Sequence, residues 1–186
     1  KEVQPDIIHL HNIHGYYLNY KLLFDYLSKV KIPIVWTLHD CWSYTGHCAY
    51  YSFIKCNRWE TECHHCLQKN SYPATYLWDN SSNNFKKKKE AFTSLSDLTI
   101  VPVSNWLADE VKKSFLNKYP IHVIHNGIDL DVFKPNTYLK TTCNNNSSFT
   151  ILGVASVWEK RKGLTDFIQL RSYLSSDYTI ILVGLS

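Results

Sequence analysis

The sequence predicts an α/β protein with parallel strands, divided near residue 140 into two parts. The first observation is that short apolar runs alternate with segments of helical periodicity, as in consecutive β-α-β units. The second is a polar stretch rich in Asn, Ser and Thr, residues 133–148, that separates two such groups of elements. The third is composition: 45% hydrophobic and 19% charged residues are typical of a folded globular chain and exclude a disordered one.

The first part opens with a strand, a helix and a strand. Residues 6–10 form a short apolar run that is typical of a buried strand. Residues 17–30 carry apolar side chains at helical spacing, and residues 32–38 form a second apolar run, which Pro33 opens. The lengths of the connections favour a parallel β-α-β unit.

Residues 40–80 then interrupt the pattern. This insertion and the strand end before it hold five of the six cysteines, many aromatic residues and little periodicity. A long segment without regular elements inside a compact domain is usually functional, or is held by something other than a core. Its aromatic residues are expected either to stack on a ligand or, more often, to form a small local core. They are Trp42, Tyr44, Tyr50, Tyr51 and Trp59.

Regular elements return after the insertion. We expect a helix at about 84–95, a strand at 98–103 and a helix after Ser104, whose hydroxyl is a good N-cap. Residues 121–125 form the next strand, which runs into a turn at Asn126-Gly127.

A second β-α-β unit follows the polar stretch, with strands near 149–156 and 178–184 around a helix. These two strands are expected in one sheet and the four earlier strands in another. Because the chain has no Met and both ends lie close to apolar strands, we expect it to be part of a longer protein with both parts incomplete.

The charge balance limits the range of partners. A net charge of +4 is too small to indicate nucleic acid, so no nucleic-acid partner is expected. No apolar run reaches the roughly 18 residues of a membrane span.

Four cysteines are spaced C-x7-C-x6-C-x2-C: Cys48, Cys56, Cys63 and Cys66. Four thiolates so placed can surround a structural Zn²⁺, and the last pair has the short step that such sites favour. The sulfurs should then converge even without the ion, and Cys41 and Cys143 should stay outside the site. Disulfides, free buried thiols and an iron–sulfur cluster remain alternatives, with His47, His64 and His65 as nearby ligands.

Four motifs together resemble bacterial GT-B glycosyltransferases of the group-1 (family 4) kind. They are WTLHDCWSYTGHCAY, VPVSNWLADEVKKS, VIHNGIDLDVFKP and LGVASVWEKRKGL, in the family's order. The likeness is greatest to the subgroup that builds capsule, colanic-acid or O-antigen polysaccharides.

This resemblance implies two Rossmann-like domains facing each other across a cleft. Residues 1–138 would be the later half of the acceptor-side domain, carrying the insertion. Residues 147–186 would begin the domain that binds the nucleotide-sugar donor. It also implies transfer with retention to a saccharide, in particular a lipid-linked one, without a metal for the chemistry. The expected location is cytoplasmic or peripheral at the inner face of the membrane.

The resemblance also suggests roles for single residues. His39, at the end of a strand, would be catalytic and would contact the transferred sugar, or else would only cap the strand. Asp40 beside it has an Asx turn as its alternative. His11 and His14 would border the cleft, or would be satisfied histidines at a strand end.

The donor diphosphate would lie in the turn between the strand at 149–156 and the next helix. Lys162 and Gly163 match the family's Lys-Gly, and a cation at a helix start suits an anion. Many relatives have Gly-Arg at the strand end, where this chain has Ala155-Ser156. Arg161 or Lys160 is therefore the candidate second cation, and Ser156 is the candidate neighbour of the phosphates.

Three alternatives stay open. The chain could be a zinc-stapled binding module without catalysis, or a sugar-nucleotide epimerase of the same fold. The lysine run at 86–89 could contact anionic lipid or be simply solvated.

Overall fold

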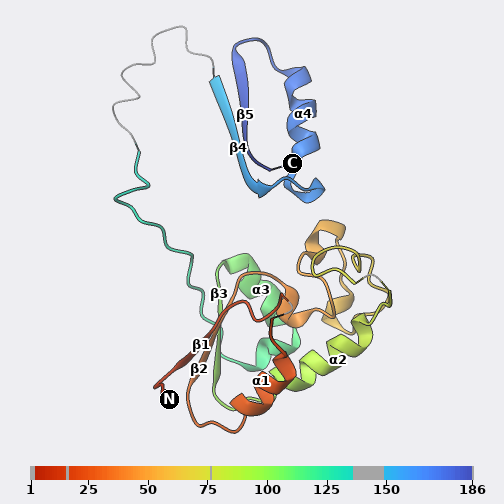
Figure 1. The fold of residues 1–186 in the computed structure, drawn as a ribbon, viewed down its shortest axis with the longest axis vertical. Coiled ribbons are helices and arrows are strands. Elements are labelled where there is room, and N and C mark those ends of the chain that lie inside the picture. Colours follow the sequence, from red (N-terminus) through yellow and green to blue (C-terminus); the bar gives the residue numbers. More distant parts are fainter. Residues whose placement is uncertain (1–2, 16, 76, 136–148, 186) are drawn as a thin grey trace. The chain divides into compact units, whose positions relative to one another are not determined.

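The computed structural model describes residues 3–15, 17–75, 77–135 and 149–185. The chain forms two compact units, Lys1–Gly127 and Ile128–Ser186 (Figure 1). The division falls inside the Asn126-Gly127-Ile128-Asp129 stretch. Most of the polar stretch at 133–148, Cys143 included, lies outside the described residues.

Unit 1 is built on a parallel sheet of three strands: β1 (Ile8–Leu10), β2 (Ile34–Leu38) and β3 (Leu98–Pro102), in the order β1-β2-β3. Ile34 of β2 lies opposite Ile8 of β1 and Leu98 of β3. The predicted parallel strands are therefore confirmed, and their carboxyl ends meet at one edge, the edge where α/β sheets bind ligands.

The segment at 121–125, expected as a full strand, only partly joins this sheet. It forms one parallel bridge, between Ile121 and Ile100, and backbone hydrogen bonds join it to β3 at 2.9–3.2 Å. Ile124 donates to the carbonyl of Pro102, but Pro102 has no N–H to return a bond. The ladder stops there because β3 ends on a proline.

Three α-helices accompany the sheet: α1 (Tyr20–Leu27), α2 (Ser81–Phe92) and α3 (Asn105–Lys113). The Asn19 side chain accepts from the Lys21 and Leu22 amides and starts α1 later than expected. Ser104 Oγ accepts from the Leu107 amide at 3.2 Å, as the sequence predicts for an N-cap.

The main core lies where α1 and α2 meet β2. Rings of Phe24, Trp36 and Phe92, one from each element, have centroids 4.6–5.6 Å apart, and all three side chains are buried. Figure 1 shows these two helices beside the sheet. Aromatic contacts at this spacing add to the hydrophobic free energy of burial.

The insertion between β2 and α2 contains three short 3-10 turns: Trp42–Tyr44, Tyr51–Ile54 and Arg58–Glu60. Tyr44, Tyr51 and Trp59 pack together with centroids 4.8–6.2 Å apart. The expected local core is confirmed for these three residues. The Tyr51 hydroxyl also donates to Glu110 of α3, which ties the insertion to that helix.

Lys88 of α2 is almost fully buried, with 2% of its surface exposed. Its ammonium donates to the carbonyls of Trp42 at 2.7 Å and Thr45 at 3.0 Å, and lies 3.5 Å from the Trp42 ring centroid. Burial lowers the pKa of Lys88 well below its usual range. One lysine of the run at 86–89 is thus part of the interior rather than of a solvated face.

Unit 2 is a single β-α-β unit of β4 (Phe149–Val157), α4 (Leu164–Tyr173) and β5 (Tyr178–Leu185). Its two strands pair in parallel as a separate sheet, as predicted. The pairing slips between Val154 and Val157, so a bulge holds Ala155 and Ser156. Gly184 lies opposite with φ of 133°, and a Cβ there would come within 1.7 Å of the Ala155 carbonyl oxygen.

Replacing Lys88 by Met tests the importance of the buried ammonium. Lys88→Met keeps most of the length of the side chain but removes the Lys88 donor from two buried carbonyls, of which that of Trp42 keeps only the longer bond from the Thr45 amide, at 3.4 Å. We expect the free energy of unfolding, measured by urea denaturation, to fall by about 2–4 kcal/mol. Lys87→Met is the matched control, because Lys87 is exposed on the same helix. Equal stability of the two variants would contradict this role.

Candidate functional site

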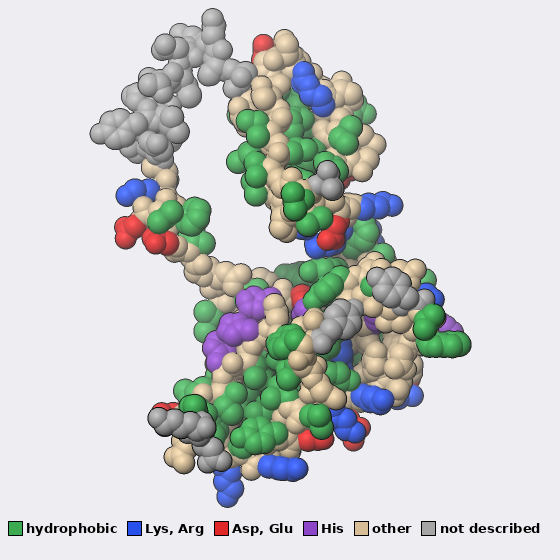
Figure 2. Space-filling view, viewed as in Figure 1, with side chains coloured by type: hydrophobic (Ala, Val, Ile, Leu, Met, Phe, Trp, Pro, Cys, Tyr) green, Lys and Arg blue, Asp and Glu red, His purple; other side chains and the backbone are tan. Residues whose placement is uncertain are grey.

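Histidines gather at the carboxyl ends of β1 and β2. His39 directly follows β2, and its Nε2 lies 3.1 Å from Nδ1 of His11, which follows β1. The two rings stack with centroids 5.4 Å apart, and both side chains are exposed. Figure 2 shows histidine side chains grouped on one face of unit 1. The topology thus brings together two residues that are 28 positions apart.

His14 and Asp40 form a more buried pair beside them. His14 Nε2 lies 2.9 Å from Asp40 Oδ2, and their side chains are 9% and 13% exposed. The other Asp40 oxygen accepts the Trp42 amide at 2.9 Å, which is an Asx turn. The Asx turn that the sequence offered for Asp40 is therefore present, and the other carboxylate oxygen lies against an imidazole; a role of Asp40 in the chemistry stays a prediction.

The insertion contributes side chains to this pair. The Tyr72 hydroxyl lies 3.1 Å from His14 Nδ1, and the Trp42 ring lies 5.0 Å from the His14 ring. Nothing in the local sequence connects Tyr72 with His14, which precedes it by 58 residues. Sequence reasoning missed Tyr72 for that reason.

A small hollow of about 10 Å³ lies among these residues. Its lining comes from the ends of β1 and β2 and from the first turn of the insertion, and includes His11, His14, His39 and Asp40. Ser43 also lines it and is buried, and its hydroxyl has no hydrogen-bond partner among the described residues. The hollow is water-sized, so a sugar would have to bind over it rather than inside it.

Two further histidines lie within hydrogen-bond distance of a strand side chain and of a backbone carbonyl, respectively. His9 Nε2 lies 2.8 Å from the Thr37 hydroxyl, and its ring lies 4.3 Å from that of His11. His125 Nδ1 lies 3.1 Å from the carbonyl of Val103, just after β3. His125 was not singled out from the sequence, although its place at the end of an apolar run was the available signal.

In unit 2, the four residues predicted for the donor gather between β4 and α4. Lys162 Nζ donates to the Val157 carbonyl at 2.9 Å, and Arg161 pairs with Glu159 at 3.1 Å. Gly163 has φ of 77° and is the N-cap residue of α4. Ser156 is exposed in the bulge of β4. The structure brings them together at one strand end, and their roles stay predictions.

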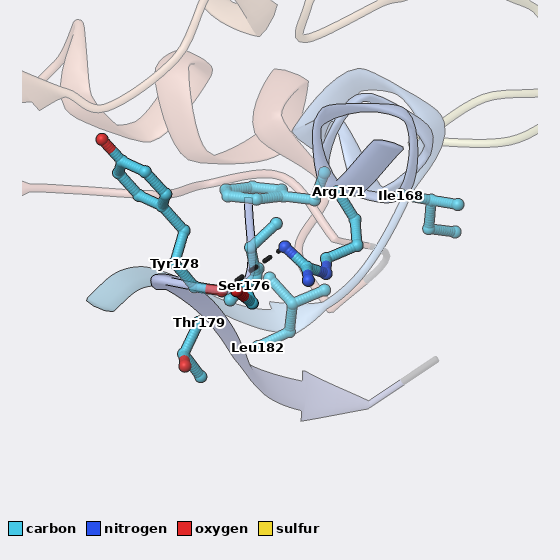
Figure 3. A pocket seen from close by; sticks show the side chains of 8 residues that line it. Ile168, Arg171, Ser176, Tyr178, Thr179 and Leu182 are labelled. Carbon is cyan, nitrogen blue, oxygen red and sulfur yellow. Dashed lines mark hydrogen bonds between the residues drawn. The ribbon is translucent and has the colours of Figure 1, made fainter. Parts of the chain in front are cut away.

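A larger cavity of unit 2 lies elsewhere, near the start of β5 (Figure 3). Its volume is about 480 Å³ and its lining includes Ile168, Arg171, Tyr178 and Leu182. The Arg171 guanidinium donates to the carbonyls of Leu174, Ser175 and Tyr178 at 3.2–3.4 Å. It therefore holds the helix-to-strand turn, at the edge of the sheet opposite to Lys162.

The cysteine cluster is a separate feature of unit 1. Cys48, Cys56, Cys63 and Cys66 line one cavity and are free thiols. A hydrogen bond from Cys48 lowers the pKa of Cys66 to about 7, whereas burial raises that of Cys63 to about 11. Among the described residues, however, no three His, Cys, Asp or Glu side chains stand in metal-binding positions. The four cysteines line one cavity but do not stand in metal-ligand positions, so the expectation that the sulfurs already form the ligand geometry without an ion is not met.

Comparison with known proteins identifies the family. The sequence matches the model of Glycosyltransferase Family 4 over residues 1–132, so the chain belongs to glycosyltransferase family 4. This confirms the family resemblance, and the matched residues include the first two motifs and most of the third.

One known protein has clear sequence identity to this chain. The chain is 33% identical over 133 residues to WcaC of Escherichia coli (strain K12), which carries the assignment of a colanic acid biosynthesis glycosyl transferase. The alignment covers 68% of this chain and 32% of WcaC, so the chain spans about a third of that relative's length.

None of the helices in the described parts of the chain has the length and apolar character needed to cross a membrane.

His39 is the residue of this site whose replacement is most informative. In the full-length protein, His39→Ala is expected to lower the rate of sugar transfer by about 10²-fold or more, the scale for losing one positioned acid–base group. The fold should persist, because the side chain is exposed. His122→Ala, at another exposed histidine of unit 1, is the control. Loss of folding, seen by circular dichroism, would instead assign His39 a structural role.

Proposed function

We propose that the full-length protein is a retaining glycosyltransferase. It moves a sugar from a nucleotide-sugar donor to a growing surface-polysaccharide acceptor, in particular a lipid-linked one. The observation that carries the proposal is the family match over residues 1–132, which includes His39 at the carboxyl end of β2. The relation to WcaC supports a polysaccharide as the product class.

His39 would contact the sugar that is transferred. One ring nitrogen, Nε2, faces His11 at 3.1 Å, and the other has no partner among the described residues. A ring held on one side by a second imidazole can direct its other nitrogen to a sugar hydroxyl. In that position it would also respond to the charge of an oxocarbenium-like transition state.

His14 and Asp40 would line the more buried side of the same site. Asp40 Oδ2 lies 2.9 Å from one nitrogen of the His14 ring, and the Tyr72 hydroxyl lies 3.1 Å from the other. Because both ring nitrogens face protein groups, His14 would position its neighbours rather than react with the sugar.

The donor diphosphate would bind between β4 and α4. Lys162 and Arg161 supply positive charge, Gly163 allows close approach of the backbone, and the start of α4 adds the favourable end of a helix dipole. Lys162 already points along the end of β4, toward the Val157 carbonyl. Stabilising the departing nucleotide would not require a metal bound by this chain.

Contact with anionic lipid, as for a lipid-linked acceptor, would depend on the lysine run of α2. Lys86, although exposed, pairs with Glu62 at 2.9 Å, and Lys88 is buried, which leaves Lys87 and Lys89 as the exposed lysines of the run without an ion pair among the described residues. Sedimentation of the protein with anionic vesicles, and not with neutral ones, tests this contact.

The function is tested by supplying labelled nucleotide-sugars and a lipid-linked saccharide fraction to the full-length protein. Transfer of label to the acceptor, with release of nucleotide and retained anomeric configuration by NMR, is expected. Epimerised nucleotide-sugar without transfer would identify an epimerase of this fold instead. Neither product from a folded protein would favour a binding module.

Lys162→Ala tests the donor site. Without this cation, turnover is expected to fall by about 10²-fold or more, because the charge that builds on the leaving diphosphate loses a preorganised partner. Donor binding, measured by calorimetry, should weaken as well. Lys29→Ala is the control, since Lys29 is an exposed lysine of unit 1. An unchanged rate for Lys162→Ala would place that residue outside the site.

A further inference from the structure

The four clustered cysteines surround one small cavity inside the insertion. Cys48, Cys56, Cys63 and Cys66 line a space of about 20 Å³, together with the buried rings of Tyr51 and Trp59. All four are free thiols, so the structure contains no disulfide among them. Hydrophobic packing alone does not require four sulfurs from an irregular segment of 19 residues to line one cavity.

The backbone donates a hydrogen bond to one of these sulfurs, from the Gly46 amide to Cys63 Sγ at 3.1 Å. The pKa of Cys66 is lowered by a hydrogen bond with Cys48 and also by the backbone of Gln68. His65, between the two cysteines, adopts the left-handed conformation with φ of 46° and makes the step from Cys63 to Cys66 compact. Amide donors favour the thiolate over the thiol and orient sulfur ligands of metals.

The backbone at Gly46 lies very close to the side chain of Cys63. A Cβ at position 46 would lie 2.7 Å from Cys63 Cβ and 2.2 Å from the Ser81 carbonyl oxygen. Only glycine therefore allows its amide to reach the sulfur. The approach is built into the backbone and does not depend on a flexible side chain.

The charge around the cluster is also unbalanced without an anion. Lys88 is buried, and no carboxylate of the described residues lies within ion-pair distance of its ammonium. Cys63, Asp40 and Cys48 are the groups that favour its charged form electrostatically. Burying an ammonium without an anion is costly, and neutral thiols do not offset it. Four thiolates around Zn²⁺ carry a net charge of about −2, which would offset it.

We propose that Cys48, Cys56, Cys63 and Cys66 bind one structural Zn²⁺ ion. Binding releases the thiol protons to solvent and replaces the hydrogen bond between Cys48 and Cys66 with four Zn–S bonds of about 2.3 Å. The sulfurs move toward a common centre when the ion enters, since they do not stand in ligand positions beforehand. The ion fixes the insertion, whose Trp42 and Tyr72 contact His14. The site is independent of the proposed transfer reaction.

Metal analysis of the purified full-length protein tests the proposal directly. We expect about one zinc per chain, and Cys63→Ser or Cys66→Ser should lower the zinc content to about a tenth or less. Cys41→Ser is the matched control, because Cys41 is a buried free thiol of the same region that does not line the cavity. It should keep its zinc.

A second measurement covers variants that fail to fold. Protein stripped of zinc and titrated with Co²⁺ should show the absorption of tetrahedral cobalt bound by thiolates, which zinc then abolishes. Iron with sulfide in place of zinc, a disulfide between any two of the four cysteines, or four thiols that react freely in a metal-free folded protein would each overturn the proposal.

Discussion

The buried ammonium of Lys88 connects helix α2 with the turn at residues 42–45 and, through the Trp42 ring, with His14. These three parts of unit 1 are separate in the sequence. The ammonium donates to the carbonyls of Trp42 and Thr45, and so fixes the turn that follows His39 and Asp40. Its position against the Trp42 ring holds that ring next to His14. Because α2 carries Lys88 and also packs Phe92 on the sheet, the helix fixes the site and the core together.

These contacts make the insertion between β2 and α2 a part of the candidate site. Trp42 begins the insertion and Tyr72 lies near its end, yet both contact His14. Tyr51 holds its middle to Glu110 of α3. The side chains that would meet a sugar at the carboxyl ends of β1 and β2 therefore depend on irregular chain, which needs its own means of stabilisation. The aromatic cluster of Tyr44, Tyr51 and Trp59 supplies one.

The sequence was sufficient for strands β1 to β5, because each is a short apolar run, but not for the segment at 121–125, which forms only one bridge. It was sufficient for the positions of His39 and of the turn with Lys162, which follow strands directly, while their roles stay predictions. It was not sufficient for Lys88, which reads as one of four successive lysines. The helical spacing of Phe85, Lys88 and Phe92 places Lys88 on the buried face of α2, but only the fold shows which groups accept its hydrogen bonds. Tyr72 could not be found at all, since its contact joins distant segments. The thiols were expected in ligand geometry without an ion, and the structure has them line one cavity without that geometry.

Hydrogen–deuterium exchange of residues 41–45, compared between the wild-type protein and Lys88→Met, tests this account most directly. The amides of Trp42, Tyr44 and Thr45 are held by Asp40, Cys41 and Trp42 in the turn that Lys88 fixes. We predict that these amides exchange faster in the variant while those of β2 and β3 keep their protection. Unchanged protection of the turn, or loss of protection confined to α2, would contradict the claim that Lys88 holds the site in place.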